Sequence, residues 1–115
     1  MDAEQFKTRT KSFALRAIRL VGSLPSSTPG NVLGRQLVRC ATSVGANYRS
    51  PYRARSRKEF VAKMGIVEEE CDESVYWLEL LADSGLMKAD RLSDLAREAN
   101  EILAMTVASI KSARR

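Results

Sequence analysis

The chain of 115 residues contains no histidine, and this absence excludes several classes of site. Ser-His-Asp and Cys-His catalysis both need an imidazole as the base. The common zinc and di-iron sites that include histidine ligands are excluded for the same reason. Since no other pairing of a nucleophile with a base stands out, we expect a protein that is not an enzyme.

Glycine, proline and aromatic residues are scarce, with six, three and seven copies, and this composition favours helices over a β-sandwich or barrel. No apolar run approaches the roughly 20 residues that span a bilayer, and residues 1–4 show no secretory signal. We therefore expect a cytoplasmic protein without a membrane segment. The length suits a single domain over residues 1–115.

Cysteine is also scarce, because Cys40 and Cys71 are the only two. Two thiols do not make a disulfide framework, and they cannot fill a tetrahedral zinc shell by themselves. Both fall on core-facing positions of predicted helices, where we expect them to act as small buried hydrophobes. A redox pair or a metal site is the alternative.

Charge is distributed unevenly along the chain. Residues 5–58 contain twelve basic and no acidic side chains, whereas residues 59–115 contain twelve acidic and seven basic ones. The net charge of +5 therefore combines a cationic first half with an anionic second half. Either the two halves neutralise one another across helix contacts, or the basic half faces an external polyanion.

The spacing of apolar residues predicts four helices, at about 3–24, 29–50, 57–84 and 90–111. Long helices joined by short linkers favour an all-α, antiparallel up-down-up-down four-helix bundle. The expected core-facing residues are Phe6, Phe13, Ala14, Ala17, Ile18, Val21, Leu24, Leu33, Leu37, Cys40, Val44, Tyr48, Phe60, Met64, Val67, Cys71, Leu78, Leu81, Leu92, Leu95, Ala96, Ala99, Ile102, Leu103, Thr106 and Ile110.

Several local signals set the predicted helix ends. Thr28 before Pro29 is typical of a helix start, with Thr28 as the cap and Pro29 at the first position. Pro51 should end or kink the second helix near Ser50. The third helix should begin at a capping box in which Ser56 and Glu59 each bond the other's backbone, and Gly85 should end it.

Two features predict close packing or self-association. Gly34 and Gly45 lie on one stripe of small residues, where another helix backbone can approach, either within the chain or in a second subunit. The segment around Tyr76 and Trp77 is apolar on more than one helix face, although a bundle core takes only one stripe. We expect this surplus, together with the two glycines, to form an oligomer interface.

The acidic run 68–73 resembles a carboxylate metal site only superficially. Helical spacing places Glu69, Asp72 and Glu73 on one side and Glu68 elsewhere. Di-iron bundles add Glu-x-x-His pairs, which are missing here. We interpret the run as a partner for the basic helices or as a solvated face, with a carboxylate-only Mg²⁺ site as the alternative, and we expect neither a metal nor a cofactor.

The basic run 48–58 contains five cationic side chains and two tyrosines. Arginine binds phosphate bidentately and tyrosine stacks on unpaired bases, so this corner is a candidate nucleic-acid interface. A solvated corner that is partly neutralised by the acidic helix is the alternative. The candidate contacts are Arg35, Arg39, Arg49, Arg53, Arg55, Arg57 and Lys58.

Segments 34–49, 55–60, 67–73 and 77–81 together resemble the signature of the four-helix-bundle proteins encoded in ribosomal RNA intervening sequences, the ribosomal S23-like family. The similarity covers roughly residues 13–110. Arg39, Ser43 and Asn47 match the motif of the second helix, and Arg55, Ser56 and Glu59 match the start of the third. Structural roles account for much of this match, with Ser43 and Asn47 expected to bond between helices. The chain departs from the family at Ser50-Pro51, where a helical stretch is more usual.

The resemblance implies an antiparallel bundle that assembles into a ring-shaped homopentamer. It also implies a relation to the accessory proteins of diversity-generating retroelements, which bind a reverse transcriptase and nucleic acid. The family has no established catalytic residues. We therefore expect an oligomeric nucleic-acid-binding accessory protein, and the alternative is a protein-interaction scaffold with no nucleic-acid role.

Overall fold

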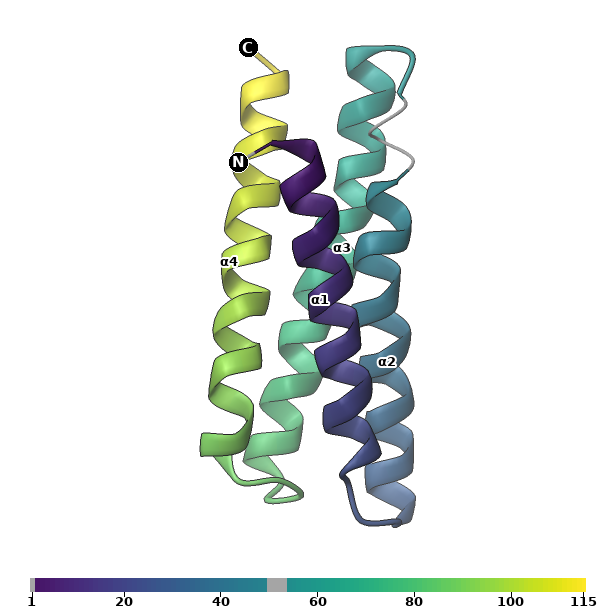
Figure 1. Cartoon of the computed structure of the whole chain (residues 1–115), viewed down its shortest axis with the longest axis vertical. Coiled ribbons are helices and arrows are strands. Elements are labelled where there is room, and N and C mark those ends of the chain that lie inside the picture. Colours follow the sequence, from purple (N-terminus) through teal and green to yellow (C-terminus); the bar gives the residue numbers. More distant parts are fainter. Residues whose placement is uncertain (1, 50–53) are drawn as a thin grey trace.

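A computed structural model describes residues 2–49 and 54–115, which form four helices and no strand. They are α1 (Ala3–Gly22), α2 (Thr28–Tyr48), α3 (Arg57–Asp83) and α4 (Ala89–Ala113). Successive helices run in opposite directions along a body 45 Å long and 19 Å across (Figure 1). The predicted all-α class and bundle architecture are confirmed. No helix in the described ranges combines the length and apolar character needed to cross a membrane.

The first two helices start at caps that sequence reasoning missed. Asp2 and Gln5 form a reciprocal capping box at the start of α1. At α2 the cap is Ser27, whose Oγ accepts from the Gly30 N–H at 3.0 Å. The predicted cap Thr28 is wrong by one position, because Thr28 is already the first residue of the helix and Ser27 has the extended geometry of a cap.

The start and end of α3 are close to prediction. Ser56 Oγ accepts from the Glu59 N–H at 3.1 Å, which confirms one half of the predicted capping box. The other half is wrong, because the Glu59 carboxylate pairs with Lys63 at 3.3 Å and not with the Ser56 backbone. Gly85 has φ +78°, the left-handed conformation that ends a helix and that favours glycine. The other ends differ by about two residues. Helix α1 stops at Gly22, α2 at Tyr48 and α4 at Ala113. The predicted break at Ser50-Pro51 lies outside the described residues.

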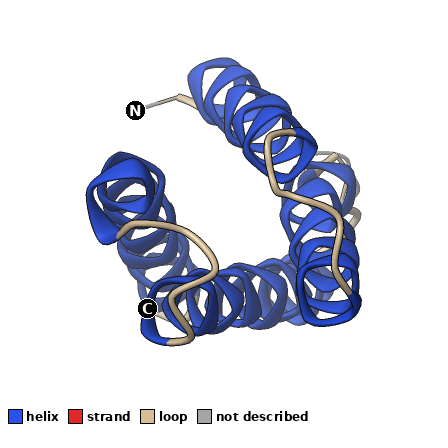
Figure 2. Cartoon of the chain, turned by 90° about the horizontal axis from the view of Figure 1, so that it is seen from below, coloured by secondary structure: helices blue, strands red, loops and turns tan. Residues whose placement is uncertain are grey.

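The helices form an open square in which α3 is central. Helix α3 packs along both α2 and α4, and α1 packs along α2, whereas α1 and α4 have the smallest contact of the four neighbouring pairs. Figure 2 shows the resulting gap between the α1 and α4 ribbons. The small contact between the first and last helices makes individual side-chain bonds across this seam important.

The core follows the predicted stripes on all four helices, with differences at their edges. Phe13, Leu37 and Ile102 are completely buried. Ile18 was expected in the core but is 46% exposed, whereas Thr10 is 1% exposed. Thr10 satisfies its hydroxyl locally by donating to the Lys7 carbonyl at 3.1 Å, so it occupies the core position between Phe6 and Phe13.

The two glycines of α2 face α1 of the same chain. A Cβ on Gly34 would lie 2.8 Å from Val21 Cγ1, and one on Gly45 would lie 3.1 Å from Thr10 Oγ1. The predicted stripe of small residues is therefore an intramolecular seam. This result corrects the assignment of Gly34 and Gly45 to an oligomer interface, since α1 already occupies the space in front of them.

Both cysteines are buried, as predicted. Cys71 Sγ donates to the Ala99 carbonyl at 3.2 Å, and burial raises the pKa of its thiol to about 12. Burial is also the main cause of a raised pKa at Cys40. Neither thiol is activated as a nucleophile in this environment.

Candidate nucleic-acid interface

Arg39 on α2 is the centre of an ion-pair cluster at the seam with α3. Its Nη1 lies 3.5 Å from Glu70 Oε2, and its Nη2 lies 3.2 Å from Glu73 Oε1. The same Nη2 lies 3.1 Å from Cys40 Sγ. Arg39 was predicted to contact nucleic acid. Its charge instead pairs with two carboxylates of its own chain, so it does not belong to the unpaired cations of the surface.

Burial shapes the titration of this cluster. Glu70 Oε2 is buried and accepts no hydrogen bond from the described residues, although it faces Arg39. Desolvation raises the pKa of the Glu70 carboxyl, and the Arg39 charge opposes that rise. Trp77 belongs to the same region, because its buried indole N–H acts on the Cys40 thiol and opposes the rise of the thiol pKa, although Nε1 makes no well-formed hydrogen bond with the residues described.

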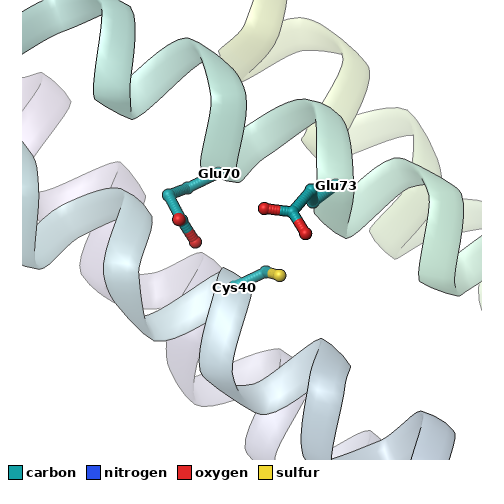
Figure 3. Close-up of side chains that lie close together, drawn as sticks. All are labelled: Cys40, Glu70 and Glu73. Atoms are coloured by element: carbon teal, nitrogen blue, oxygen red, sulfur yellow. The ribbon is translucent and has the colours of Figure 1, made fainter.

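The cluster brings together three atoms that resemble a set of metal ligands. Cys40 Sγ and one carboxylate oxygen from each of Glu70 and Glu73 lie within 4.8 Å of one another, with Cys40 on α2 and the glutamates on α3 (Figure 3). The Arg39 guanidinium contacts all three. The cationic partner of this ligand set is therefore a side chain, and the arrangement joins α2 to α3 electrostatically.

A second ion pair joins the two charged halves between α1 and α4. Arg9 donates to both oxygens of Glu98, at 2.6 and 2.8 Å, and reaches Glu101 at 3.2 Å. The hydrogen bond from Arg9 lowers the pKa of the Glu98 carboxyl below its ordinary value. Together with the Arg39 cluster, this pair shows that the basic and acidic halves neutralise one another at two seams.

The acidic run divides differently from the prediction. Glu70 and Glu73 face Arg39 on α2, which confirms the expected pairing with a basic helix. Glu68, Glu69 and Asp72 instead line a shallow hollow with Leu103 and Val107 of α4. The prediction that Glu73 shares one side of the helix with Glu69 and Asp72 was wrong. Helices α2 and α4 pack on different sides of α3, and Glu73 faces α2 whereas Glu69 and Asp72 lie beside α4.

Ser43 and Asn47 bond within their own helix. Ser43 Oγ donates to the Arg39 carbonyl at 2.7 Å, and Asn47 Nδ2 donates to the Ser43 carbonyl at 2.8 Å. The expectation that they bond between helices is therefore wrong. Side chains of this type reach back to the carbonyl four residues earlier when no other partner is nearer.

The other predicted cations that lie in the described part of the chain are exposed, but they are not all together. Arg49 ends α2, while Arg55, Arg57 and Lys58 lie at the start of α3, at the same end of the bundle. Arg35 lies fourteen residues before Arg49, which is about 20 Å along the helix axis. It therefore belongs to another part of the surface. Arg53 lies outside the described residues.

Other cations that sequence reasoning missed also lie at this end. Helix α4 ends beside the start of α3, where Arg57 Nη1 donates to the Arg115 carbonyl at 3.1 Å. We call the group of exposed cations at this end the cationic end; its members are Arg49, Arg55, Arg57, Lys58, Lys111, Arg114 and Arg115. The antiparallel topology could have predicted this grouping, because α2 and α4 end at the same end of the bundle where α3 begins.

Tyr76 and Trp77, the predicted interface aromatics, lie side by side on α3. Their ring centroids are 5.1 Å apart in an edge-on arrangement. Tyr76 is 52% exposed, whereas Trp77 is partly buried near the Arg39 cluster. Of the predicted interface residues, Tyr76 is thus the one with a large exposed apolar surface.

The fold and the site define a four-helix-bundle protein with a cationic end. The chain belongs to the 23S rRNA-intervening sequence protein family, whose model matches residues 4–108. It is also similar to a protein of unknown function from the S23 ribosomal protein family of Bacteroides thetaiotaomicron, whose crystal structure is known. The two chains are 31% identical and superpose with a TM-score of 0.88, over 96% of this chain and 99% of the other. No match was found among curated proteins.

Proposed function

We propose that the protein is a non-enzymatic, oligomeric nucleic-acid-binding accessory protein of the cytoplasm, acting on RNA or DNA. The observation that carries this proposal is the cationic end. Arg9 and Arg39 pair with carboxylates of their own chain, yet seven other basic side chains gather at one end of the bundle and remain exposed. Clustered lysine and arginine side chains are the electrostatic footprint of a phosphate-binding surface.

Oligomerisation would strengthen such a surface. In a homopentameric ring, as the family resemblance implies, the cationic end would occur once in each subunit. Sites that are linked in this way raise the effective concentration of one another for a long polyanion. The exposed Tyr76 supports self-association, because a large exposed aromatic on a helix is typical of a protein interface.

The same aromatic supports a second candidate function, a scaffold that binds a protein. The partner would be a protein such as a reverse transcriptase, if the relation to retroelement accessory proteins extends to this chain. The two ion-pair seams favour this alternative, because they reduce the positive charge that is available to nucleic acid.

Binding of fluorescent single-stranded RNA and DNA, measured by anisotropy from about 50 to 200 mM salt, tests the proposal. We expect affinity to fall steeply with salt, since each phosphate contact releases counterions. The triple variant Arg55→Ala, Arg57→Ala, Lys58→Ala should bind more weakly with a shallower salt dependence. A matched control, Arg19→Ala, Lys88→Ala, Arg97→Ala, removes the same charge elsewhere and should lose much less.

The outcomes separate the two functions. No binding by the wild-type protein at 50 mM salt would contradict the nucleic-acid proposal. Recovery of one defined protein partner after nuclease treatment would then favour the scaffold. Native mass spectrometry of the same preparation gives the number of subunits and tests the pentamer directly.

A further inference from the structure

A hollow of about 200 Å³ lies between α1 and α2, below the cationic end. Three cationic side chains line it: Lys7 and Lys11 of α1, and Arg49 of α2. Lys7 and Lys11 are four residues apart and so share one face of α1. The floor is formed where the two helices approach closely, at Thr10 and Gly45. None of the four α1 residues that line this hollow belonged to the nucleic-acid interface predicted from sequence.

The charge of this hollow is not neutralised in the way that Arg9 and Arg39 are. Within residues 2–49 and 54–115, Lys11 and Arg49 form neither an ion pair nor a side-chain hydrogen bond. Lys7 Nζ approaches Glu4 at 3.5 Å, but the Glu4 side chain is 69% exposed, so that pair is weak. Like charges on one seam repel, and an anion between them would relieve the repulsion.

The hydrogen-bonding groups select the chemistry of the ligand. Thr10 Oγ1 donates to the Lys7 carbonyl at 3.1 Å, and Thr42 Oγ1 donates to the Val38 carbonyl at 2.7 Å. Because both hydroxyl protons are used inside their own helices, the charged donors of the hollow are the Lys11 ammonium and the Arg49 guanidinium, beside the Lys7 ammonium that already approaches Glu4. Such a donor set suits an oxyanion with several acceptor oxygens, above all a phosphate.

Size limits the ligand further. Pockets for drug-sized ligands and cofactors measure roughly 300–1,000 Å³, so a hollow of about 200 Å³ is too small for a complete nucleotide cofactor. It suits one phosphate with part of its sugar. Gly45 lets α1 and α2 approach closely, with Thr10 packed directly against it, so that cations of both helices line the same small hollow.

We propose that this hollow is a dedicated binding site for one backbone phosphate of a single-stranded nucleic acid. The inference rests on the proposed function and adds to it a site that adjoins the cationic end and shares Arg49 with it. Lys7 and Lys11 would contact the phosphate from α1, and Arg49 would contact it from α2. The cationic end would then guide the strand toward the hollow, which fixes its position.

The test compares two double variants that remove the same charge. Lys7→Ala, Lys11→Ala alters the hollow and leaves every member of the cationic end in place, and Arg19→Ala, Lys88→Ala removes two exposed cations elsewhere. Circular dichroism and urea unfolding verify that both variants fold. We measure anisotropy of a fluorescein-labelled 20-nucleotide RNA against salt. The hollow variant should lose about tenfold or more in affinity, and its log–log salt slope should become shallower by about 0.7, the value for one phosphate contact on a single strand. The control variant should keep the wild-type slope.

Each other outcome has a distinct meaning. If the wild-type protein binds no RNA, both the proposed function and this site are overturned. If the wild-type protein binds and the two double variants lose affinity equally, the site is overturned and the function stands. Inorganic phosphate is the probe for a free anion. If it shifts the Gly45 amide resonance while RNA affinity does not depend on Lys7 and Lys11, the hollow binds small anions and the strand-phosphate inference is wrong.

Discussion

Arg9 and Glu98 form a two-bond ion pair that joins the first helix to the last, with donor–acceptor distances of 2.6 and 2.8 Å. The pair bridges α1 and α4, the two neighbouring helices that contact each other least. Its side chains are only 28% and 14% exposed, so water screens it less than an ordinary surface pair. It stabilises the seam where the square of helices is open.

Replacing Glu98 by Gln should lower the free energy of unfolding by about 2 kcal/mol at pH 7, because a bidentate charged bond is lost and Arg9 is left half-buried. Urea unfolding followed by fluorescence of Trp77, the only tryptophan, measures this loss. Asp94→Asn is a matched control, since the Asp94–Arg97 pair is highly exposed. A loss at Glu98 no larger than at Asp94 would contradict a stabilising role for the pair.

The effect of Glu98 should depend on pH in one direction. The folded-state pKa of Glu98 is lowered from its ordinary value of 4.5, so the pair contributes fully above about pH 5. The contribution is lost as pH falls through the lowered folded pKa. The stability difference between the wild-type protein and Glu98→Gln should therefore be constant from pH 8 to about pH 6 and should shrink below pH 4.5. A difference that grows as the solution is acidified would refute this assignment.

Arg39 and Glu70 should be energetically coupled. Arg39→Met leaves the buried Glu70 oxygen facing no cation, and we expect a loss of about 2 kcal/mol at pH 7. In a Glu70→Gln background the same change should cost less, because the buried charge is gone. A double-mutant cycle by urea unfolding measures the coupling, and simple additivity of the two changes would disprove it.

The glycines of the bundle should respond in opposite ways to alanine. Gly34→Ala places a methyl group 2.8 Å from Val21, whereas Gly65→Ala meets no atom within 4 Å. Both changes gain the same helix propensity, about 1 kcal/mol. Gly65→Ala should therefore stabilise the protein. The Gly34→Ala variant should be less stable than the Gly65→Ala variant by about 1–3 kcal/mol because of overpacking. Thermal unfolding of the two variants gives this difference, and equal melting temperatures would contradict the close approach of α1 to Gly34.

The thiols should be unreactive until the protein unfolds. Both are buried, and their pKa values are raised, to about 12 at Cys71. We expect no labelling by a disulfide reagent at pH 8 in native protein and two labels per chain in urea. Rapid labelling of Cys40 in the native state would show that the Arg39 cluster opens readily.

Much of the fold could be predicted from sequence, because its signals are periodic and local. The stripe from Phe6 to Ala17 and the Gly85 stop needed only neighbours along the chain. The edges of each stripe could not be predicted in this way. Ile18 lies one position past the buried Ala17, and it is exposed to solvent. Hydrophobicity alone also overlooks Thr10, which becomes a core residue only once its hydroxyl is bonded within the helix.

The site was less predictable, because it depends on which helices meet. Arg39 looks like a free cation until α3 places Glu70 and Glu73 against it, more than thirty residues further along the chain. Lys11 looks like an ordinary surface lysine until α2 returns antiparallel and brings Arg49 to the same hollow. Pairings of this kind follow from tertiary packing and not from spacing in sequence.

The central position of α3 also determines where the bundle resists opening. Helices α2 and α3 each pack along two neighbouring helices, and the contact between them is the most extensive in the bundle. Their amide hydrogens should therefore be the last to exchange with solvent. This slow-exchanging pair spans the point at residues 58–59 where the chain changes from cationic to anionic. The change of charge is therefore not a division between folding units. Two peptides separated there would each lose half of the most protected core, and neither half should fold without the other.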